Sequence, residues 1–284
     1  MRQWLWLFVA MAIASGEVSH PSARQVTNDG SISIDPLHKP FDEVLDLNVR
    51  DGLVYYRTLQ VERGKLDRYV ASLNAPSTNA EYPKWPRERQ IAFWLNAYNA
   101  FVLETVINRY PIRGSAPEYP ANSIRQIPGA FDRIVHPAAG RRLTLDAIET
   151  GILSGFGDPR LLLALGRGAV GSPRLRSEAF AADRLERQLR EAAAEFATSL
   201  RFIQVDRGAN RLGVSPIIGW RQDAFEAAYG GQTQTFASRS PIERAVLAFI
   251  RPHLLPAERE FLDRDEFQMS YQEFDWHLND LTGR

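Results

Sequence analysis

Apolar residues recur at helical spacing in several parts of the chain, with polar residues between them. This spacing places apolar side chains on one face of a helix, which a globular protein buries. The segments contain Phe41, Val44 and Leu45; Leu66, Tyr69, Val70 and Leu73; Leu185, Leu189, Ala193, Phe196 and Leu200; and Val246, Phe249 and Ile250. The last of them follows Ser240-Pro241-Ile242-Glu243, a capping-box pattern with proline in the first turn, which predicts where that helix begins.

The stretch from Arg87 to Arg109 predicts a helix at the centre of the core, because it is apolar nearly all the way round. Pro111 ends it. Asn96 and Asn99 fall within its apolar arc, so we expect buried amides, which must be hydrogen-bonded. We expect both to hold a neighbouring loop; the alternative is that they face a ligand.

Two segments have the pattern of β-hairpins. Residues 133–135 and 142–145 flank a predicted turn at 136–140, and residues 202–206 and 211–214 flank another at 207–210. No repeat, low-complexity tract or internal domain boundary is evident in the sequence. The pattern as a whole predicts an α+β fold: a mainly helical single domain with a small antiparallel sheet formed by hairpins.

The first residues have the three parts of a secretory signal: a positive start, an apolar stretch of about 11 residues and then small residues. A helix that spans a membrane needs about 20 apolar residues, which is more than this stretch has. We therefore predict a signal peptide at 1–15, a flexible polar tether at 16–36 and one globular domain at 37–284. The protein would be exported to a periplasm or secreted, with no transmembrane anchor after cleavage; an uncleaved anchor or a buried first helix are the alternatives.

Composition narrows the classes of function. The 284 residues carry 34 basic and 34 acidic side chains, so no overall charge favours nucleic acid or an anionic membrane. The apolar fraction of 44% is ordinary for a globular protein. There is no cysteine, which excludes disulfides and attachment of a lipid through a thiol.

Neither a metal nor a nucleotide cofactor is predicted. The five histidines, His20, His38, His136, His253 and His277, are scattered and form no zinc motif. The segment 166–171 fits the G-x-G-x-x-G pattern of dinucleotide sites. However, Pro173 follows it where a helix would have to open, and no strand–helix alternation surrounds it.

The same glycine-rich segment holds two further candidates. Ser172 could act as a nucleophile if an adjacent base activated it, although a turn serine that bonds its own backbone is the ordinary alternative. Arg167, Arg174 and Arg176 lie within ten residues, and guanidinium groups bind carboxylate or phosphate in a fork. An anion pocket is one interpretation, and a solvated or salt-bridged surface loop is the other.

Several segments together resemble a bacterial family called domain of unknown function 547, over roughly Phe41 to Asn279. They are Ala92-Phe93-Trp94-Leu95-Asn96-Ala97-Tyr98-Asn99-Ala100, Arg109-Tyr110-Pro111-Ile112, Ser123-Ile124-Arg125, Gly140 to Glu149, Asp158-Pro159-Arg160 and Asp275-Trp276-His277-Leu278-Asn279. The polar residues that match are Asn96, Asn99, Arg125, Glu149, Arg160 and Asn279. The resemblance suggests a structural network for them rather than a catalytic set.

The family pattern has cysteines and histidines that this chain lacks. Thr150 and Leu162 stand where the family usually has histidine, Gly166-Arg167 where it has asparagine-cysteine, and Ser172 where it has the cysteine before proline. A thiol–imidazole pair works by lowering the pKa of the nucleophile, and neither partner is present. The resemblance therefore implies a divergent member without the family's suspected chemistry.

Two functions from different classes follow from these observations. The first is a non-catalytic, pseudoenzyme-like binding or scaffold protein, with an anionic small molecule or an unknown protein as its partner near Gly166–Arg176. The second is a hydrolase or acyl-transfer enzyme that uses Ser172 in place of the family's cysteine. Ligand-binding candidates are Arg167, Arg174, Arg176, Asn96, Asn99, Arg125 and Glu149.

Overall fold

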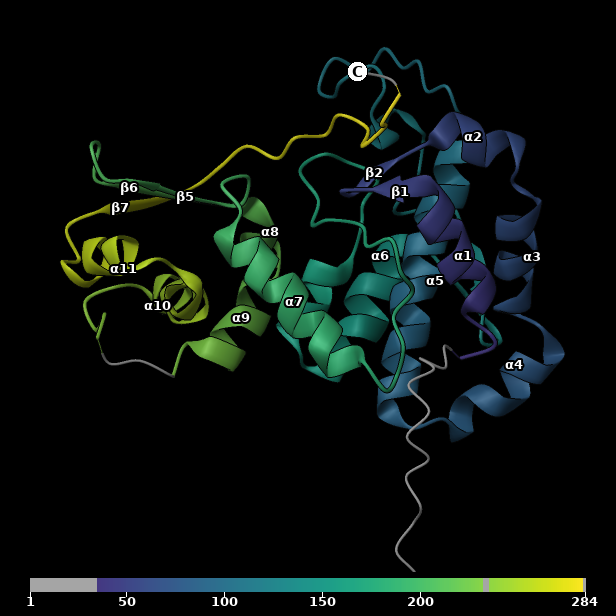
Figure 1. The fold of residues 1–284 in the computed structure, drawn as a ribbon, viewed down its shortest axis with the longest axis horizontal. Coiled ribbons are helices and arrows are strands. Elements are labelled where there is room, and N and C mark those ends of the chain that lie inside the picture. The colour runs from purple at the N-terminus through teal and green to yellow at the C-terminus, as the bar shows by residue number, and fades with distance from the viewer. Residues whose placement is uncertain (1–34, 232–234, 283–284) are drawn as a thin grey trace, which may run out of the picture. The chain divides into compact units, whose positions relative to one another are not determined.

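Helix α5 (Arg87–Ile107) lies at the centre of the packing in the computed structural model, which describes residues 35–231 and 235–282. Its side chains are buried at nearly every position from Ile91 to Ile107, as a helix that is apolar all round requires. Helices α2 (Tyr56–Val61) and α3 (Gly64–Ser72) and the segment Ile148–Leu153 pack against it (Figure 1). The predicted signal peptide and the predicted tether up to residue 34 lie outside the described residues.

The chain before α5 is a set of short helices with one small hairpin. The elements are α1 (Lys39–Asn48), β1 (Val49–Arg50), β2 (Leu53–Val54), α2 (Tyr56–Val61), α3 (Gly64–Ser72), α4 (Pro76–Glu81) and the 3-10 helix η1 (Tyr82–Lys84). The two strands pair antiparallel across Asp51 and Gly52, which both have positive φ. The apolar pattern did not predict this hairpin, because each strand has only two residues.

The middle of the chain contains short and irregular elements: η2 (Ile124–Gln126), β3 (His136–Ala138), β4 (Arg141–Leu143), α6 (Leu145–Ala147), the π-helix η3 (Ile148–Leu153), η4 (Ser154–Phe156) and η5 (Pro159–Ala164). The hairpin predicted here exists, but its predicted register is wrong. Residues 136–138 form a strand rather than a turn, and the turn is Ala139-Gly140, both at positive φ. A two-residue turn with this geometry fits the twist of paired strands.

The last third contains α7 (Leu185–Thr198), β5 (Ile203–Asp206), β6 (Arg211–Val214), α8 (Pro216–Trp220), α9 (Gln222–Tyr229), α10 (Pro241–Ile250), η6 (Arg251–His253), α11 (Pro256–Asp263) and β7 (Gln268–Tyr271). The predicted hairpin of β5 and β6 is confirmed, and Ser240 and Glu243 form the predicted capping box of α10. Strand β7 adds to β6 in parallel, so this three-stranded sheet is mixed.

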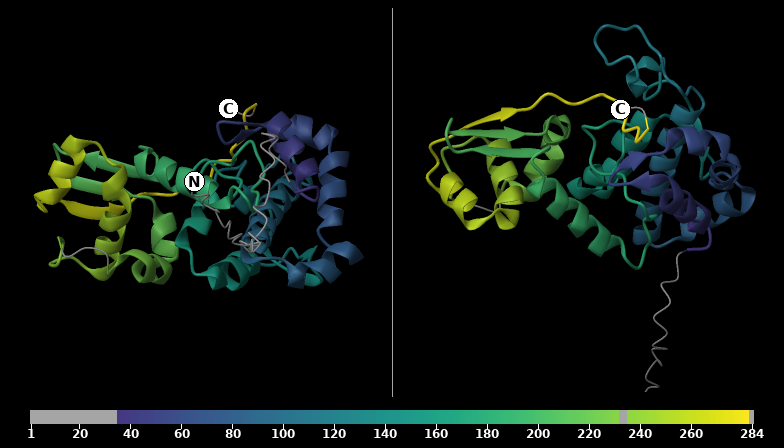
Figure 2. Two further views of the ribbon diagram at one scale, coloured as in Figure 1. Left: turned by 60° about the horizontal axis from the view of Figure 1, so that its bottom comes forward. Right: turned by 45° about the horizontal axis from the view of Figure 1, so that its top comes forward.

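After β7 the chain returns to the hairpin near its beginning, as the yellow segment in Figures 1 and 2 shows. Val54 donates its backbone N–H to Asn279, and Leu281 donates its own to Val54. The buried Tyr56 hydroxyl donates to Asn279 Oδ1 at 2.7 Å. Asn279, one of the matched polar residues, is therefore part of a structural network.

The predicted fold class is confirmed: the residues that the structure describes form one compact unit that is mainly helical with small sheets. One cluster of buried apolar residues extends from Phe41 to Leu278. Among the described helices, none combines the length and the apolar character needed to cross a membrane.

Candidate functional site

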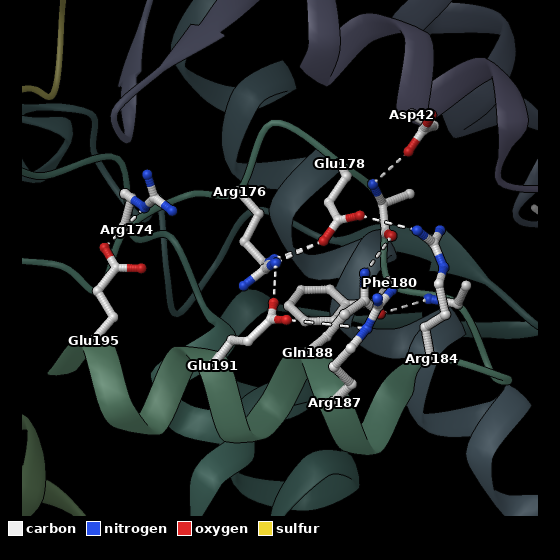
Figure 3. Close-up of polar contacts among 12 residues, drawn as sticks. Asp42, Arg174, Arg176, Glu178, Phe180, Arg184, Arg187, Gln188, Glu191 and Glu195 are labelled. Atoms are coloured by element: carbon white, nitrogen blue, oxygen red, sulfur yellow. Dashed lines mark hydrogen bonds and ion pairs between the residues drawn. The ribbon is translucent and has the colours of Figure 1, made fainter. Parts of the chain in front are cut away.

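The three arginines of the segment 167–176 do not form one pocket. Arg174 Nε lies 2.8 Å from Glu195 on α7, and Arg176 Nη2 lies 2.6 Å from Glu178 and 2.7 Å from Glu191 (Figure 3). These contacts agree with the alternative that the sequence left open, a salt-bridged loop. Arg174 and Arg176 do not line the cavity that Arg167 lines, and α7 offers a carboxylate to each of them.

The stretch around Glu178 is an ionic and amide network that ties the loop to α7 (Figure 3). Asn96 ties the same stretch to α5 through the backbone of Phe180. Glu178 also pairs with Arg184 at 3.0 Å. Although burial acts to raise the pKa of Glu178, its bond to Arg176 and the other partners hold that pKa below its usual value. Gln188 donates to Ala179 O and accepts from Ala181 N.

Asn96 and Asn99 each hold a loop with both ends of the amide, as the sequence led us to expect. Asn96 exchanges hydrogen bonds with the backbone of Phe180, at 2.9 and 2.8 Å. Asn99 donates to Ala164 O at 3.0 Å and accepts from Gly166 N at 2.8 Å. Both amides are buried and fully engaged inside the protein, so neither is placed to face a ligand.

Unlike Arg174 and Arg176, which pair with α7, Arg167 pairs with Glu149. Its side chain is almost fully buried, and its Nη2 lies 2.9 Å from Glu149 Oε2. The second oxygen of Glu149 lies 3.0 Å from Nη2 of Arg221. One buried carboxylate is therefore shared by two guanidinium groups, an arrangement that offsets the large cost of burying a charge.

These groups line a cavity of about 140 Å³, which we call the chamber. Its lining consists of three arginines, two carboxylates and three aromatic rings: Arg125, Arg167, Arg221, Asp146, Glu149, Phe131, Trp220 and Trp276. Arg167 and Glu149 are its buried part, whereas Arg125 and Asp146 are exposed. The chamber thus has a buried charged end and an end that is open to solvent.

Arg125 is held by aromatic rings rather than by a carboxylate. Its guanidinium carbon lies 4.4 Å from the ring centre of Trp276 and 4.7 Å from that of Phe131. In the part of the chain that the structure describes, this guanidinium has no hydrogen-bond or ion-pair partner. Cation–π contacts fix the position of the charge and leave its N–H donors unused.

Arg221 also keeps a donor in reserve. Its Nε is buried and has no hydrogen-bond partner among the described residues, while its Nη2 pairs with Glu149. The Nη2 of Arg167 is not free in this sense, because it faces Glu149 Oε2 at 2.9 Å. A guanidinium has five N–H donors, and a buried donor without a partner costs free energy. The chamber therefore has guanidinium donors, on Arg125 and Arg221, that no acceptor of the described chain uses.

Asp146 differs from the other carboxylates of the described residues. Its pKa is raised, first by the partial burial of the carboxyl and then by the negative charge of Glu149, while Arg125 acts in the opposite direction. The side chain has no hydrogen-bond or ion-pair partner among the residues described. It stands at the exposed end of the chamber as a carboxyl that gains a proton more readily than usual.

The fold positions Arg167 through two hydrogen bonds to its own loop. Asn99 holds the amide of Gly166, as described above, and Ser172 Oγ accepts the N–H of Arg167 at 3.0 Å. Ser172 is buried, and its Oγ makes no contact with a histidine in the residues described. The condition for a nucleophilic serine, a base within reach, is not met there. Ser172 is a positioning residue for Arg167.

Glu149 lies in the π-helix η3, which packs on α5. A π-helical turn inserts one extra residue per turn and re-aims side chains, and such turns are frequent at functional sites. Thr144 caps the preceding helix α6 by accepting from Ala147 N at 3.1 Å. The local backbone is thus irregular at the residue that carries the buried charge.

A second and larger cavity adjoins the chamber, with about 580 Å³, and we call it the groove. It is lined by Thr150, Ser154, Gly219, Trp220, Arg221, Gln222, Asp223 and Ala224. Trp220 and Arg221 line both cavities. Thr150, which stands at a family histidine position, belongs to the groove.

The chamber contains residues that the sequence did not single out. Asp146 and Trp276 fall inside motif segments quoted above, but nothing marked their side chains as site residues. Phe131, Trp220 and Arg221 carried no signal, since their place depends on contacts far apart in the chain. Arg125, Glu149 and Arg167 were candidates, and the structure brings these three together.

The described histidines are placed apart from both cavities. His136 is buried and stacks on Phe101 at 4.5 Å, and His38 shares a hydrogen bond of 2.8 Å with Tyr69. No group of three or more histidine, aspartate or glutamate side chains that could hold a metal ion occurs in residues 35–231 and 235–282.

Comparison with protein families gives a match. The model of a family described as "Protein of unknown function, DUF547" matches residues 82–197, which confirms the resemblance seen in the sequence over that part of the predicted range. No curated protein and no solved structure matches the chain. The matched region supplies Arg125, Phe131, Asp146, Glu149 and Arg167 to the chamber, while Trp220, Arg221 and Trp276 come from the chain beyond it.

Proposed function

Residues 82–197 belong to the DUF547 family, and from that premise we propose that the protein is an exported, non-catalytic binding protein for small carboxylates. The ligand's carboxylate would occupy the chamber. The observation that carries this proposal is that guanidinium donors around a partly buried cavity are left unused by the protein's own acceptors. Arg125 contributes a whole guanidinium without a hydrogen-bonded partner in the described chain.

Charge supports an anion with a single negative charge. Three guanidinium groups face two carboxylates in the chamber, which leaves one positive charge over. Glu149 already pairs with both Arg167 and Arg221, so its negative charge balances part of their positive charge. A carboxylate would bring one further charge and two oxygens, and guanidinium forks match that geometry.

Size supports a small group. Since one water occupies about 30 Å³ in the liquid, a chamber of about 140 Å³ has room for about four or five atoms of that size. A carboxylate with one or two attached carbons fits this space. The aromatic walls, Phe131, Trp220 and Trp276, would contact the carbon atoms, whereas the arginines would contact the oxygens.

Several features favour binding over catalysis. The family's cysteine and histidine positions hold Arg167, Ser172, Thr150 and Leu162. Arg167 and Ser172 are engaged with each other through the loop backbone, and Leu162 is buried in the core. Replacing a nucleophile by a buried arginine converts a reacting position into one that attracts anions.

Export is part of the proposal and rests on the composition of residues 1–15, as set out above. Expression of the full chain in a Gram-negative host, followed by fractionation and N-terminal sequencing, tests it. We expect a mature chain in the periplasm or the medium that begins near residue 16. A full-length chain found only in the cytoplasm would contradict export.

Carboxylate binding is tested by calorimetric titration with propionate and with propionamide, which has nearly the same shape and no charge. We expect propionate to bind with a Kd of about 1 mM, corresponding to about 4 kcal/mol, and propionamide to bind at least tenfold more weakly. Arg125→Gln should reduce the affinity for propionate at least tenfold, because it removes the unpaired charge.

Arg174→Gln is the matched control, because Arg174 is paired with Glu195 outside the chamber. It should leave the affinity for propionate unchanged. Equal affinities for propionate and propionamide, or equal losses in the Arg125 and Arg174 variants, would show that the chamber is not a carboxylate site.

A further inference from the structure

The groove beside the chamber suggests what the rest of the ligand looks like, an inference that rests on the function proposed above. A carboxylate held in the chamber can extend into the groove, because Trp220 and Arg221 line both cavities. The groove, at about 580 Å³, is about four times as large as the chamber. It has room for a six-membered ring with its substituents.

The groove presents hydrogen-bond acceptors. The Asp223 carboxylate has no hydrogen-bond or ion-pair partner among the described residues. Gln222 donates its amide N–H to Glu226 at 2.9 Å and keeps its carbonyl oxygen for another donor. Thr150 donates its hydroxyl proton to Asp146 O at 2.7 Å and keeps its oxygen lone pairs. A ligand that fits here carries several donors.

The groove also has one flat apolar surface. Trp220 is 38% exposed, so part of its indole is open to a ligand in the groove. Phe274 packs against it with ring centres 4.9 Å apart, and Trp276 stacks on it at 6.2 Å with 16° between the rings. These neighbours hold the indole in one orientation, so it can receive a ring without losing further freedom.

We propose that the physiological ligand is an acidic sugar, a ring that carries one carboxylate and several hydroxyl groups. The carboxylate would lie among Arg125, Arg167 and Arg221. The apolar face of the ring would lie on Trp220, and its hydroxyl groups would donate to Asp223, Gln222 and Thr150. This arrangement uses the charge of the chamber, the exposed indole and the acceptors of the groove together.

Two other classes of acid fit these features less well. A fatty acid would place an aliphatic chain against Asp223, Gln222 and Arg221, where it would desolvate polar groups without replacing their hydrogen bonds. A small amino acid could place its ammonium near Asp146, but it would leave Trp220 and the acceptors of the groove without contacts. Both classes serve as competitors in the test.

The test compares ligands on the full chain by calorimetric titration. The probes are D-glucuronate, propionate, D-glucose, hexanoate and β-alanine. We expect D-glucuronate to bind at least tenfold more tightly than propionate, hexanoate or β-alanine, and D-glucose to bind more weakly than D-glucuronate by at least tenfold. Only D-glucuronate has both the carboxylate and the hydroxylated ring.

Two variants separate the groove from the chamber. Asp223→Asn should weaken D-glucuronate about tenfold, the loss of one charge-assisted hydrogen bond, and leave propionate unchanged. Arg125→Gln should weaken both ligands. Asp51→Asn, with an aspartate 95% exposed at the β1–β2 turn, is the control and should change neither.

The outcomes are distinguishable. If propionate binds and D-glucuronate binds no more tightly, the acidic-sugar proposal is overturned while carboxylate binding stands. If hexanoate or β-alanine binds most tightly, the ligand belongs to that other class. If no carboxylate binds, the proposed function itself fails. An unchanged affinity for D-glucuronate in Asp223→Asn would also overturn the placement of the ring in the groove.

Discussion

Glu149 is the residue on which the charges of the chamber depend. Both its oxygens are within 3.0 Å of a guanidinium nitrogen, from Arg167 and Arg221. Removing one partner of a buried ion pair is strongly destabilising, because the other charge stays in the low-dielectric interior. Substitutions at this ion pair should therefore change the free energy of unfolding as well as the affinity for a ligand.

We expect Arg167→Met to lower the free energy of unfolding by about 3 kcal/mol, since methionine fills part of the volume but leaves Glu149 with one cation fewer. Denaturant unfolding measures it. The double variant with Glu149→Gln should recover part of the loss, because it removes the uncompensated charge. Arg174→Met, at a guanidinium 42% exposed, should cost less than about 1 kcal/mol. Similar losses in the two single variants would contradict the burial of the Arg167–Glu149 pair.

For individual residues, the sequence predicted the candidate site residues better than it predicted their interaction partners. Arg125, Glu149 and Arg167 were candidates, and they meet in the chamber. Arg174 and Arg176, only a few positions further on, are paired with α7. The direction of each arginine side chain depends on partners that are distant in the sequence. The local sequence pattern does not reveal those partners.

The loop that carries Arg167 packs closely against the backbone of the returning C-terminal segment. Gly171 donates its backbone N–H to Asp275 of the returning C-terminal segment at 2.8 Å. A Cβ at position 171 would lie 2.7 Å from Asp275 N and 3.0 Å from Asp275 O. The next residue, Trp276, is a wall of the chamber. The glycine-rich pattern therefore reflects close backbone packing rather than a nucleotide site.

Gly171→Ala should consequently displace the segment that carries Trp276. We expect a loss of about 1–3 kcal/mol in stability from the overpacked contact, together with a weaker affinity for propionate. Thermal unfolding and calorimetric titration measure the two effects. Gly155→Ala is the control, because nothing lies within 4 Å of a Cβ there, and it should change neither quantity. If Gly171→Ala binds propionate as the wild type does, Trp276 does not depend on this contact.

Among the elements, those with a long periodic pattern were predicted well. Helices α5, α7 and α10 and the β5–β6 hairpin lie where the apolar spacing placed them. The errors are at short elements, where His136 begins a strand instead of a turn, and at the parallel addition of β7 to β6. A two- or three-residue strand carries too little pattern, and a parallel pairing across more than 50 residues leaves none in the local sequence.

For the molecule as a whole, one buried histidine links stability to pH. Burial, the main cause, lowers the pKa of His38 to about 4; Asp35 acts to raise it, and Arg89 acts to lower it. Its Nδ1 lies 2.8 Å from Tyr69 Oη, and its buried Nε2 has no hydrogen-bond partner among the described residues. The folded protein therefore holds this imidazole neutral at pH values where the unfolded chain would protonate it.

The direction of the pH effect follows from the two states. Between pH 6.5 and about 4 the unfolded chain binds one more proton at His38 than the folded protein does, so stability falls as the pH falls. The contribution is complete above pH 6.5 and amounts to about 3 kcal/mol. We expect His38→Gln to lose less stability than the wild type between pH 7 and pH 4, as measured by denaturant unfolding. Parallel curves for the two proteins would contradict this assignment.

The proposed function depends on an anion binding in the chamber. A ¹⁹F NMR titration of trifluoroacetate, a carboxylate small enough for the chamber, tests this with the wild type, Arg125→Gln and Arg174→Gln. We predict that the fluorine line broadens or shifts with the wild type and with Arg174→Gln, and that about ten times more Arg125→Gln is needed for the same effect. An unchanged line with the wild type, or a response lost in Arg174→Gln and kept in Arg125→Gln, would contradict carboxylate binding in the chamber.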